Sequence, residues 1–411
     1  MALTVLLGLA APSYLLLVRL LRYRRMESLQ ESFGRDGRPL SRMTAEEAHR
    51  IVEALQTLEF PQAFGKARQM ALLKAGGITT MSKLFAATGQ NNRRNAGKRA
   101  VDTEIVLREA QTNPRNSERY AQAVARMNFL HARYRRAGKI TDNDLLHTLG
   151  DGLAEIFTVV DRDEWRRLTD VERCAIGVFH KNLAEDMDIP LDPLPSSDQG
   201  WTDGLHFARE LKQWTIEYEE RVARPTETND QYVRVYVDSA VSSLPGFVRT
   251  MLRGTLGMDL DDVMRESLCI EAPGPLLRAA LIVKREIRRL ILRHLCLPRS
   301  ASRPIKLLQA TPDPKTKMYA FERKGLQPWY VKPTISSVWG PQALLFKLLG
   351  GRTPGSRGDR YKPQGYDLRT IGPEPQHGKG LEEMEADAKN IMARTVGCPF
   401  GARARIDSKV R

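Results

Sequence analysis

The sequence predicts an all-α protein with a single large helical domain, and two observations support this fold class. Between residues 44 and 299, apolar side chains recur at helical spacing in segment after segment, separated by glycine, proline or polar breaks. The glycine-rich motifs GxGxxG and the P-loop, which join strands to helices in nucleotide-binding α/β proteins, are absent. With 411 residues, the chain can bury a sizeable core.

Composition divides the chain into four parts. Residues 1–25 are an apolar run closed by four arginines, which predicts one transmembrane anchor with the rest of the chain in the cytosol. A cleaved secretory signal is the alternative, although Pro12 makes the candidate cleavage site a poor one. Polar residues 26–43 predict a linker, residues 44–299 the helical domain, and the Pro- and Gly-rich residues 300–411 an irregular tail packed on that domain.

The helical domain can be followed element by element from local signals. Thr44 and Glu47 predict a capping box, and Gly76-Gly77 predicts a break between two helices. Pro245 predicts another boundary. The predicted helical segments are 44–58, 61–89 with its break, 98–110, 126–157 as a hairpin, 165–189, 204–224, 229–256 with its break, and 276–297.

Charge and cysteine content narrow the class of partner. The net charge is +15, yet no zinc-finger spacing, RNP-like signature or long basic tail is present, so we expect no nucleic-acid partner. A membrane surface is the better partner, and the arginine-rich face of 276–297 could lie either against anionic lipid or in solvent. The four cysteines are widely separated without a CxxC pair, which indicates reduced thiols rather than a zinc site.

The segment 126–157 predicts a helical hairpin that presents His131 and, one turn later, Arg135. Gly138 breaks the first arm, and Asp142 or Asp144 can cap the second. A neutral imidazole can ligate a transition metal or haem iron, and an adjacent arginine can neutralise a haem propionate. The alternative for a lone histidine on such a helix is a hydrogen-bonded core residue.

The helix predicted over 98–110 places Arg99 and Thr103 four residues apart on one face, with Asp102 beside them. Considered without any relative, this pattern is that of an exposed Arg–Asp pair at a helix start.

Three stretches carry a resemblance to a known family: RMNFLHARYRRAGKIT in the hairpin, WRRLTDVE after it, and KR..DTE around Arg99. Together they resemble the catalytic domain shared by fungal ER-bound oxygenases of the mycophenolic acid type and bacterial rubber oxygenases (latex-clearing proteins). The resemblance implies an all-α domain built around haem b that uses dioxygen to cleave carbon–carbon double bonds in isoprenoid chains.

The resemblance also implies roles for individual residues. His131 would be the proximal ligand of the haem iron, and Arg135 would pair with a propionate. Arg99 and Thr103 would lie beside the haem and position oxygen or stabilise negative charge on it. Asp102 and Glu104 are the nearest candidates for a catalytic base.

Two further histidines need separate treatment. His180 stands where the fungal branch usually has tryptophan, so we expect it not to ligate iron, although a second axial ligand or a distal group is the alternative. His147 is the closest rival to His131, because it lies on the facing arm of the hairpin.

The sequence therefore predicts a haem-dependent oxygenase of the endoplasmic reticulum membrane, single-pass, with its catalytic domain in the cytosol. Its partners would be O2 and a hydrophobic small molecule, such as a prenyl chain or a related natural-product intermediate. Two alternatives stay open: another tailoring enzyme on the same scaffold, such as a cyclase or hydroxylase, and a non-catalytic membrane-bound helical binding protein.

Overall fold

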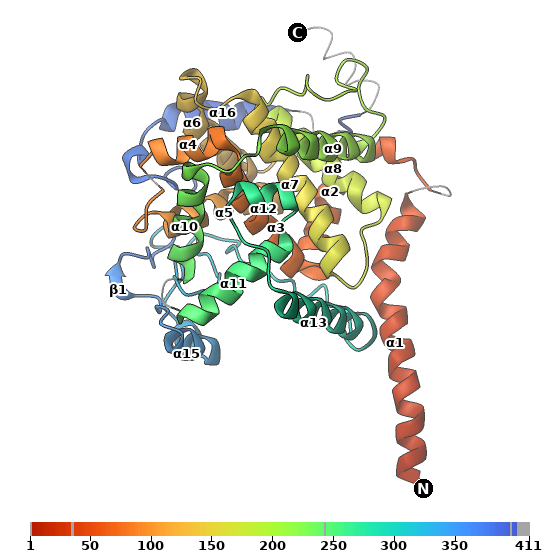
Figure 1. Cartoon of the computed structure of the whole chain (residues 1–411). Helices are drawn as coiled ribbons and strands as arrows, with labels where there is room; N and C mark the ends of the chain where they lie inside the picture. Colours follow the sequence, from red (N-terminus) through yellow and green to blue (C-terminus); the bar gives the residue numbers. More distant parts are fainter. Residues whose placement is uncertain (1, 34–36, 90, 242–243, 395–396, 401–411) are drawn as a thin grey trace.

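A computed structural model describes the chain apart from residues 1, 34–36, 90, 242–243, 395–396 and 401–411, and gives only the backbone of residues 2–9 and 238–240. Its described elements are helices and one short strand, β1 (Ser356–Asp359), in a single domain, so the predicted fold class is confirmed (Figure 1). In chain order the helical elements are α1 (Ala2–Ser32), η1 (Leu40–Arg42), α2 (Ala45–Ala54), η2 (Leu55–Glu59), α3 (Pro61–Lys74), η3 (Ala75–Gly77), α4 (Thr79–Ala87), α5 (Ala96–Thr112), α6 (Glu118–Arg136), α7 (Asp142–Asp163), α8 (Asp170–Asp186), α9 (Gly204–Val222), α10 (Glu227–Val241), α11 (Gly246–Asp259), α12 (Asp262–Ser267), α13 (Pro275–His294), α14 (Ile335–Trp339), α15 (Pro341–Leu348), η4 (Glu374–Gln376) and α16 (Leu381–Ala393).

The long helix α7 lies inside the bundle and packs against α3, α8 and α9. Its side chains are buried on several faces, including Leu146, Leu153 and Val159, which have no exposed surface. A helix that is enclosed in this way contributes core on one side and can form the wall of a cavity on another. Around it, α2 packs on α8 and α5 packs on α6.

Capping boxes fix where α2, α7, α8 and α14 begin. The Thr44 hydroxyl accepts from the Glu47 amide, and the Glu47 carboxylate accepts from the Thr44 amide, as the sequence predicts. For α7 the N-cap is Thr141 rather than Asp142 or Asp144, and Asp144 contributes to the cap as the capping-box partner whose carboxylate accepts from the Thr141 amide. The capping box at Thr169 starts α8 at Asp170 rather than at residue 165.

The predicted break at Gly76-Gly77 is confirmed as the short element η3. A close approach requires glycine here, because a Cβ on Gly76 would lie 1.9 Å from Cδ1 of Tyr232 on α10. The bare backbone lets α10 pack directly on η3. The boundary predicted at Pro245 is also confirmed, since Pro245 is the N-cap of α11.

The N-terminal helix α1 runs to Ser32, so the first part of the predicted linker is helical. Good helix formers such as Met26, Leu29 and Gln30 explain the extension. Among the described residues, no helix has the length and apolar character needed to cross a bilayer. The predicted transmembrane anchor over residues 1–25 is therefore not supported.

The amphipathic helix α13 is oriented differently from the sequence expectation. The guanidinium groups of Arg285 and Arg288 pair with Asp163 and Glu164 at the end of α7, and Arg289 donates to the Glu164 carbonyl. Much of the basic face therefore lies against the protein, and the expectation that it is turned towards lipid or solvent is wrong for these three arginines.

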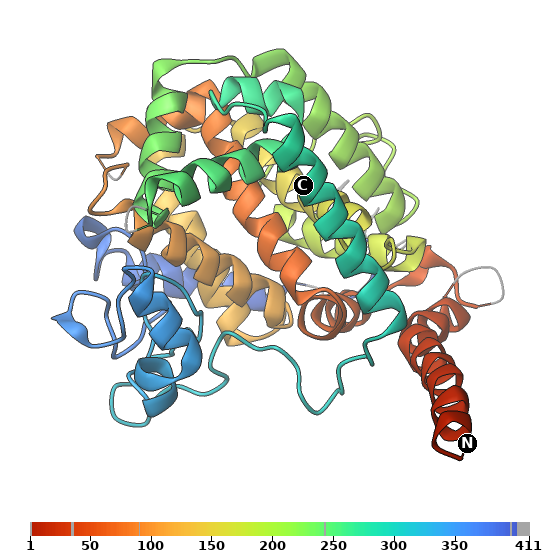
Figure 2. The same cartoon turned by 60° about the horizontal axis from the view of Figure 1, so that its bottom comes forward.

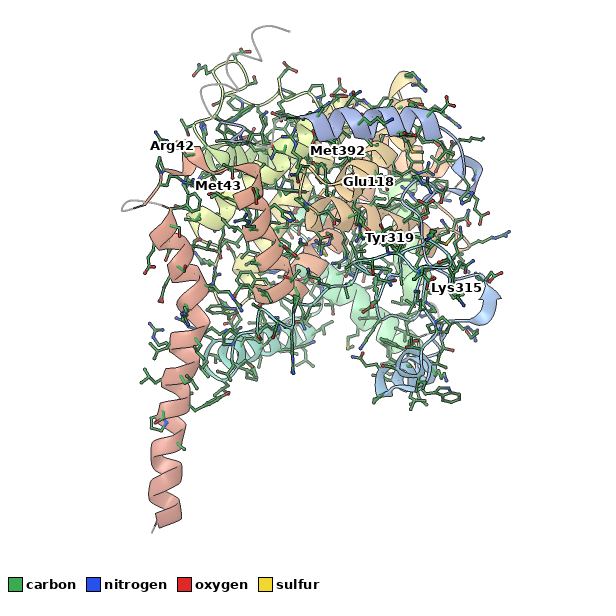
Figure 3. The ribbon with its side chains drawn as sticks, turned by 180° about the vertical axis from the view of Figure 1, so that it is seen from behind. Arg42, Met43, Glu118, Lys315, Tyr319 and Met392 are labelled. Carbon is green, nitrogen blue, oxygen red and sulfur yellow. The ribbon has the colours of Figure 1, made fainter. Side chains whose placement is uncertain are left out.

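The C-terminal residues pack over the back of the domain and contain helices that the sequence analysis missed. Figure 3 shows α16, which carries Met392, beside α6, which begins at Glu118, and these two helices are in contact. Tyr330 is buried and its hydroxyl donates to Asp102 at 2.6 Å, while the Tyr366 hydroxyl donates to Glu109. Through these contacts the tail is packed against α5 and α6 as part of the domain.

Candidate functional site

A cavity of about 880 Å³ is enclosed by α3, α4, α5, α6, α7, α8 and α10 and is bordered by residues 371–376 of the tail. Its volume is within the range of sites for small molecules and cofactors. The wall is mostly apolar; it includes Leu72, Leu84, Phe85, Val106, Leu107, Met127, Phe129, Leu130, Leu145, Leu149, Leu183, Met187 and Ile189.

His131 lines this cavity from α6. Its Nδ1 atom is buried and has no hydrogen-bond partner among the described residues. Burial, followed by the charges of Arg135 and Arg99, lowers the pKa of His131 to about 4. The imidazole is therefore neutral at physiological pH, which is the form that ligates metals.

His180 lines the same cavity from α8. Its Nδ1 lies 2.8 Å from the Ile176 carbonyl, which can only accept, so Nδ1 carries the proton and Nε2 carries the lone pair. Burial lowers the pKa of His180 to about 4. A backbone partner on one ring nitrogen is common for metal-ligating histidines, so the alternative of an axial or distal role for His180 gains weight from its position.

Arg99 and Thr103 both line the cavity from α5, as their spacing predicts. The Arg99 guanidinium lies 4.0 Å above the ring of Phe85, and burial lowers its pKa. No carboxylate pairs with Arg99 among the described residues, so the cavity holds a cation that lacks an anionic partner. The Thr103 hydroxyl donates to the Arg99 carbonyl at 3.0 Å and keeps its lone pairs for accepting.

Arg135 lies outside the cavity wall. It donates to the carbonyls of Met187 and Asp188, at the end of α8, and pairs loosely with Asp142. These contacts do not support its expected role at a propionate. The last carbonyl groups of a helix have no partner within the helix, and those that follow the end of α8 accept hydrogen bonds from the Arg135 guanidinium.

Other cations stand where the cavity meets solvent, and the sequence analysis did not single them out. Four exposed basic side chains line the cavity there: Arg94, Arg133, Arg136 and Lys139. Three of them belong to the run RYRRAGK in the predicted hairpin 126–157, so the density of basic residues in that run was the available signal.

The two candidate bases differ in position. Asp102 borders the cavity, and burial raises its pKa against the opposing effects of Lys98 and Tyr330. Its two oxygens accept from Lys98 and Tyr330 at 2.5 and 2.6 Å. Glu104 does not line the cavity and pairs with Arg108 and Arg323. Asp102 is therefore the nearer carboxylate, but its oxygens already have donors.

The tail segment at the cavity is held from α5 and α6. The buried Arg126 donates from Nε to the Ile371 carbonyl at 2.7 Å and from Nη2 to the Thr370 and Gln376 carbonyls at 3.3 and 3.2 Å. Lys98 donates to the Gly372 carbonyl at 2.7 Å. No sequence signal near residues 371–376 indicated that they border the site.

His147, the rival ligand, lies in a separate polar cluster on α7 rather than in the cavity wall. Its Nε2 is 2.9 Å from Glu219. Lys74 also lies 2.9 Å from Glu219 and 3.1 Å from Asp151, and these four side chains are almost fully buried. The set His147, Asp151 and Glu219 has ligand atoms within 4.8 Å of one another, but the Lys74 ammonium already supplies a cation there.

The residues of the cavity fit a haem. A haem needs an apolar slot, a neutral axial ligand and cations for its propionates. The apolar wall provides the slot, and His131 or His180 provides a neutral imidazole. Arg99 and the basic side chains at the opening provide the cations. The donor set is one of imidazoles in an apolar environment, which suits haem iron better than a hard cation such as Mg²⁺.

The histidines, Arg99 and the apolar cavity define a candidate small-molecule site in an all-α protein. Comparison with known proteins gives the family of the chain. No family model matches the chain. It is 34% identical to the ER-bound oxygenase mpaB' of Penicillium brevicompactum over 390 residues, which covers 94% of this chain and 92% of the relative.

Two further relatives carry the same type of name. The ER-bound oxygenase mpaB of Penicillium brevicompactum is 32% identical over 90% of this chain and 87% of its own length. That of Penicillium roqueforti (strain FM164) is 37% identical over 62% of this chain and 87% of its own length. The chain belongs to this family of ER-bound oxygenases of the mycophenolic acid type, as the sequence resemblance indicated. The relation to rubber oxygenases stays a prediction.

Proposed function

We propose that this oxygenase depends on haem b and cleaves a carbon–carbon double bond in a prenyl chain or a related hydrophobic natural-product intermediate. The observation that carries the proposal is the neutral His131 imidazole, with its unpartnered nitrogen, in an apolar cavity that also contains the unpaired cation of Arg99. In this proposal His131 holds the iron, and His180 lines the pocket without ligating it.

When bound, haem supplies an iron that binds dioxygen and makes its oxygen atoms available to the substrate. The protein's own contribution is to orient and to stabilise charge. Arg99 lies in the low-dielectric cavity, where its charge acts strongly on an oxygen that becomes negative. The Thr103 hydroxyl donates its proton to the Arg99 carbonyl, so it presents an acceptor in the cavity beside Arg99. Alternatively, Arg99 pairs with a haem propionate. Removal of Arg99 would then weaken haem binding, whereas removal of a charge that acts on oxygen would lower turnover.

The apolar wall gives the site its preference for substrate. A prenyl chain has no polar groups that would be left unpaired beside Leu84, Leu107 or Leu149, and its burial excludes water from the reacting bond. The basic side chains at the opening would hold a polar or anionic head of the substrate, or the propionates, at the solvent side. Both oxygen atoms of O2 would end in the two carbonyl groups that replace the double bond.

We also propose that the protein associates with the endoplasmic reticulum membrane and that its catalytic domain faces the cytosol. The relatives are named as ER-bound, and the chain matches two of them over 90% of its length or more.

The test of the catalytic proposal combines a spectrum with product analysis. Purified protein supplied with haem should show a Soret band and, with O2 and a prenylated substrate, should release two carbonyl fragments. Arg99→Met should lower turnover by about tenfold to a thousandfold while most of the haem stays bound. Thr103→Val should lower turnover less, because the Thr103 proton is already donated to the Arg99 carbonyl. A hydroxylated but uncleaved chain would instead support a hydroxylase on the same scaffold, and absence of a Soret band would refute haem dependence.

A further inference from the structure

The outer face of α13 is apolar, and the described residues leave it exposed. Its exposed apolar side chains recur at helical spacing and form one stripe: Leu276, Val283, Ile287, Leu290 and Ile291. On the opposite side Arg285 and Arg288 pair with Asp163 and Glu164. The helix is thus attached to the body by its charged face, which is the reverse of an ordinary surface helix.

Neighbouring elements expose apolar side chains as well. Phe247 and Met251 are exposed on α11, and Ile335 and Trp339 are exposed on α14. On α15 the exposed set is Leu344, Leu345 and Leu348. Single exposed apolar residues are normal, but several helices with such stripes indicate an interaction surface.

These helices gather on one side of the molecule. In Figure 1, α11, α13 and α15 lie along the lower side, and α1 extends below them; Figure 2 brings that side forward. The exposed stretch of α1 contributes Leu16, Leu17 and Leu20. The Tyr14 hydroxyl donates to the Leu295 carbonyl at 2.9 Å, so α1 joins this side at the end of α13. We define the lower face as the exposed apolar residues of α11, α13, α14 and α15.

Charge decides between the possible occupants of the lower face. Helix α13 carries six Arg or Lys residues and one Glu, and exposed Lys284 and Arg293 lie on either side of its apolar stripe. A second copy of the chain would bring the same basic residues against these, which costs free energy. An anionic lipid surface offers the opposite charge and an apolar interior. Lys347 lies 4.1 Å from the Trp339 ring, and Trp and Lys together are typical of the membrane–water interface.

We propose that the lower face lies in the surface of the bilayer, with the α13 stripe and the side chains of α14 and α15 buried among the acyl chains and the bordering basic residues at the headgroups. The protein is then attached by several helices that lie in the membrane plane. This proposal rests on the proposed membrane association and not on the haem chemistry.

The chain contains a native probe for the test. Of its five tryptophans, Trp339 is 66% exposed, whereas Trp165, Trp201, Trp214 and Trp329 are at most 7% exposed. Full-length protein is mixed with vesicles of phosphatidylcholine and phosphatidylinositol whose acyl chains carry bromine, which quenches tryptophan on contact. We expect quenching in the wild type, and we expect Trp339→Phe to abolish it while vesicle binding persists.

A second measurement uses flotation with the same vesicles. The triple variant Val283→Gln, Ile287→Gln, Leu290→Gln should bind about tenfold more weakly or worse, because three apolar side chains no longer gain from burial. The matched control is Ile216→Gln, Leu381→Gln, Met392→Gln, which changes three exposed apolar residues on α9 and α16, across the molecule in Figure 1. The control should float like the wild type, and circular dichroism confirms that both variants fold.

Three results would overturn the proposal: no vesicle binding by the wild type, binding without quenching of Trp339, or equal flotation of the two triple variants. Quenching that persists in Trp339→Phe would count against it as well. The Soret band of the same protein reports on the haem site separately, so failure of one proposal is distinguishable from failure of the other.

Discussion

Replacing Lys74 by methionine tests what holds the wall of the cavity in place. Lys74 ends α3, and its ammonium lies 3.1 Å from Asp151, 3.3 Å from Glu155 and 2.9 Å from Glu219. Two of these carboxylates belong to α7 and one to α9. The same helix α7 also lines the cavity, through Leu145, Leu149 and Gly152. Loss of the Lys74 ammonium should therefore disturb α7, which forms part of the cavity wall.

The size of the expected loss in stability follows from the burial of Lys74 and its three carboxylate partners. All four side chains are at most 8% exposed. Burial lowers the pKa of Lys74, but Asp151, Glu219 and Glu155 outweigh this effect and hold it well above its usual value. Removal of one partner from a buried ion pair costs roughly 3–5 kcal/mol, because the remaining charges stay uncompensated. We expect Lys74→Met to lower the free energy of unfolding by about 4 kcal/mol at neutral pH.

The loss should depend on pH in a defined direction. In the wild type, the raised pKa of Lys74 keeps its ammonium charged throughout the acid and neutral range, and burial already raises the pKa values of Asp151 and Glu155 against the lowering effect of Lys74. In the variant this lowering effect is lost, so the folded pKa values of the two carboxylates lie still further above their unfolded values. Buried carboxyl groups with raised pKa values stabilise the folded variant only while they are protonated, so the variant loses stability as the pH rises. The difference between wild type and variant should therefore grow from about pH 5 to about pH 8.

The assay is denaturant unfolding followed by circular dichroism at several pH values. The control is Lys66→Met on the same helix: Lys66 lies 2.7 Å from both Asp163 and Asp259, but its side chain is 33% exposed, so the loss should be about 1 kcal/mol or less. Equal losses for the two variants, or a Lys74→Met loss that does not change with pH, would refute the reasoning from burial.

Three further outcomes are expected. Gly76→Ala should lower the free energy of unfolding, measured by thermal unfolding, by about 2 kcal/mol or more, because the new Cβ would lie 1.9 Å from Tyr232. The control Gly65→Ala should be neutral or stabilising, because the atom nearest to its new Cβ is 3.8 Å away. Similar results for the two variants would contradict the close packing of Tyr232 on Gly76. Arg126→Met removes donors to three tail carbonyls, so a protease should cut the tail several-fold faster, and an unchanged rate would mean that other contacts hold it. Haem affinity should stay constant from about pH 8 to about pH 5 and fall near the His131 pKa of about 4, because a proton then competes with the iron for the imidazole. If the affinity of folded protein instead fell with a midpoint near pH 6.5, the ligand would be an exposed histidine.

Local signals in the sequence predicted the helices well where the signal and the structure depend on the same few residues. The Thr44–Glu47 capping box and the break at Gly76-Gly77 are of this kind. The start of α8 was misplaced because Trp165, which is buried beside Tyr23 of α1, is apolar for tertiary reasons and not because it belongs to a helix. The short helices of the tail depend on distant partners in the same way, and α16 is fixed by its contact with α6.

The candidate site was predictable only in part. Spacing placed Arg99 and Thr103 on one face, and both line the cavity with His131. Spacing also placed Arg135 one turn after His131, but it cannot show that the end of α8 offers carbonyl acceptors to Arg135. The orientation of α13 was not predictable either, because Asp163 and Glu164, which bind its arginines, lie more than a hundred residues earlier in the chain.

The proposed role of His131 is tested most directly by titrating haem into full-length wild type and three variants while recording the absorption spectrum. His131→Ala should lose stoichiometric binding, because the iron loses its protein ligand. His180→Ala and the control His206→Ala, which alters a histidine bonded to Glu210 outside the cavity, should keep the haem and the Soret band. A His131→Ala protein that is folded by circular dichroism and binds one haem with the wild-type spectrum would contradict the account, most clearly if His180→Ala then failed to bind.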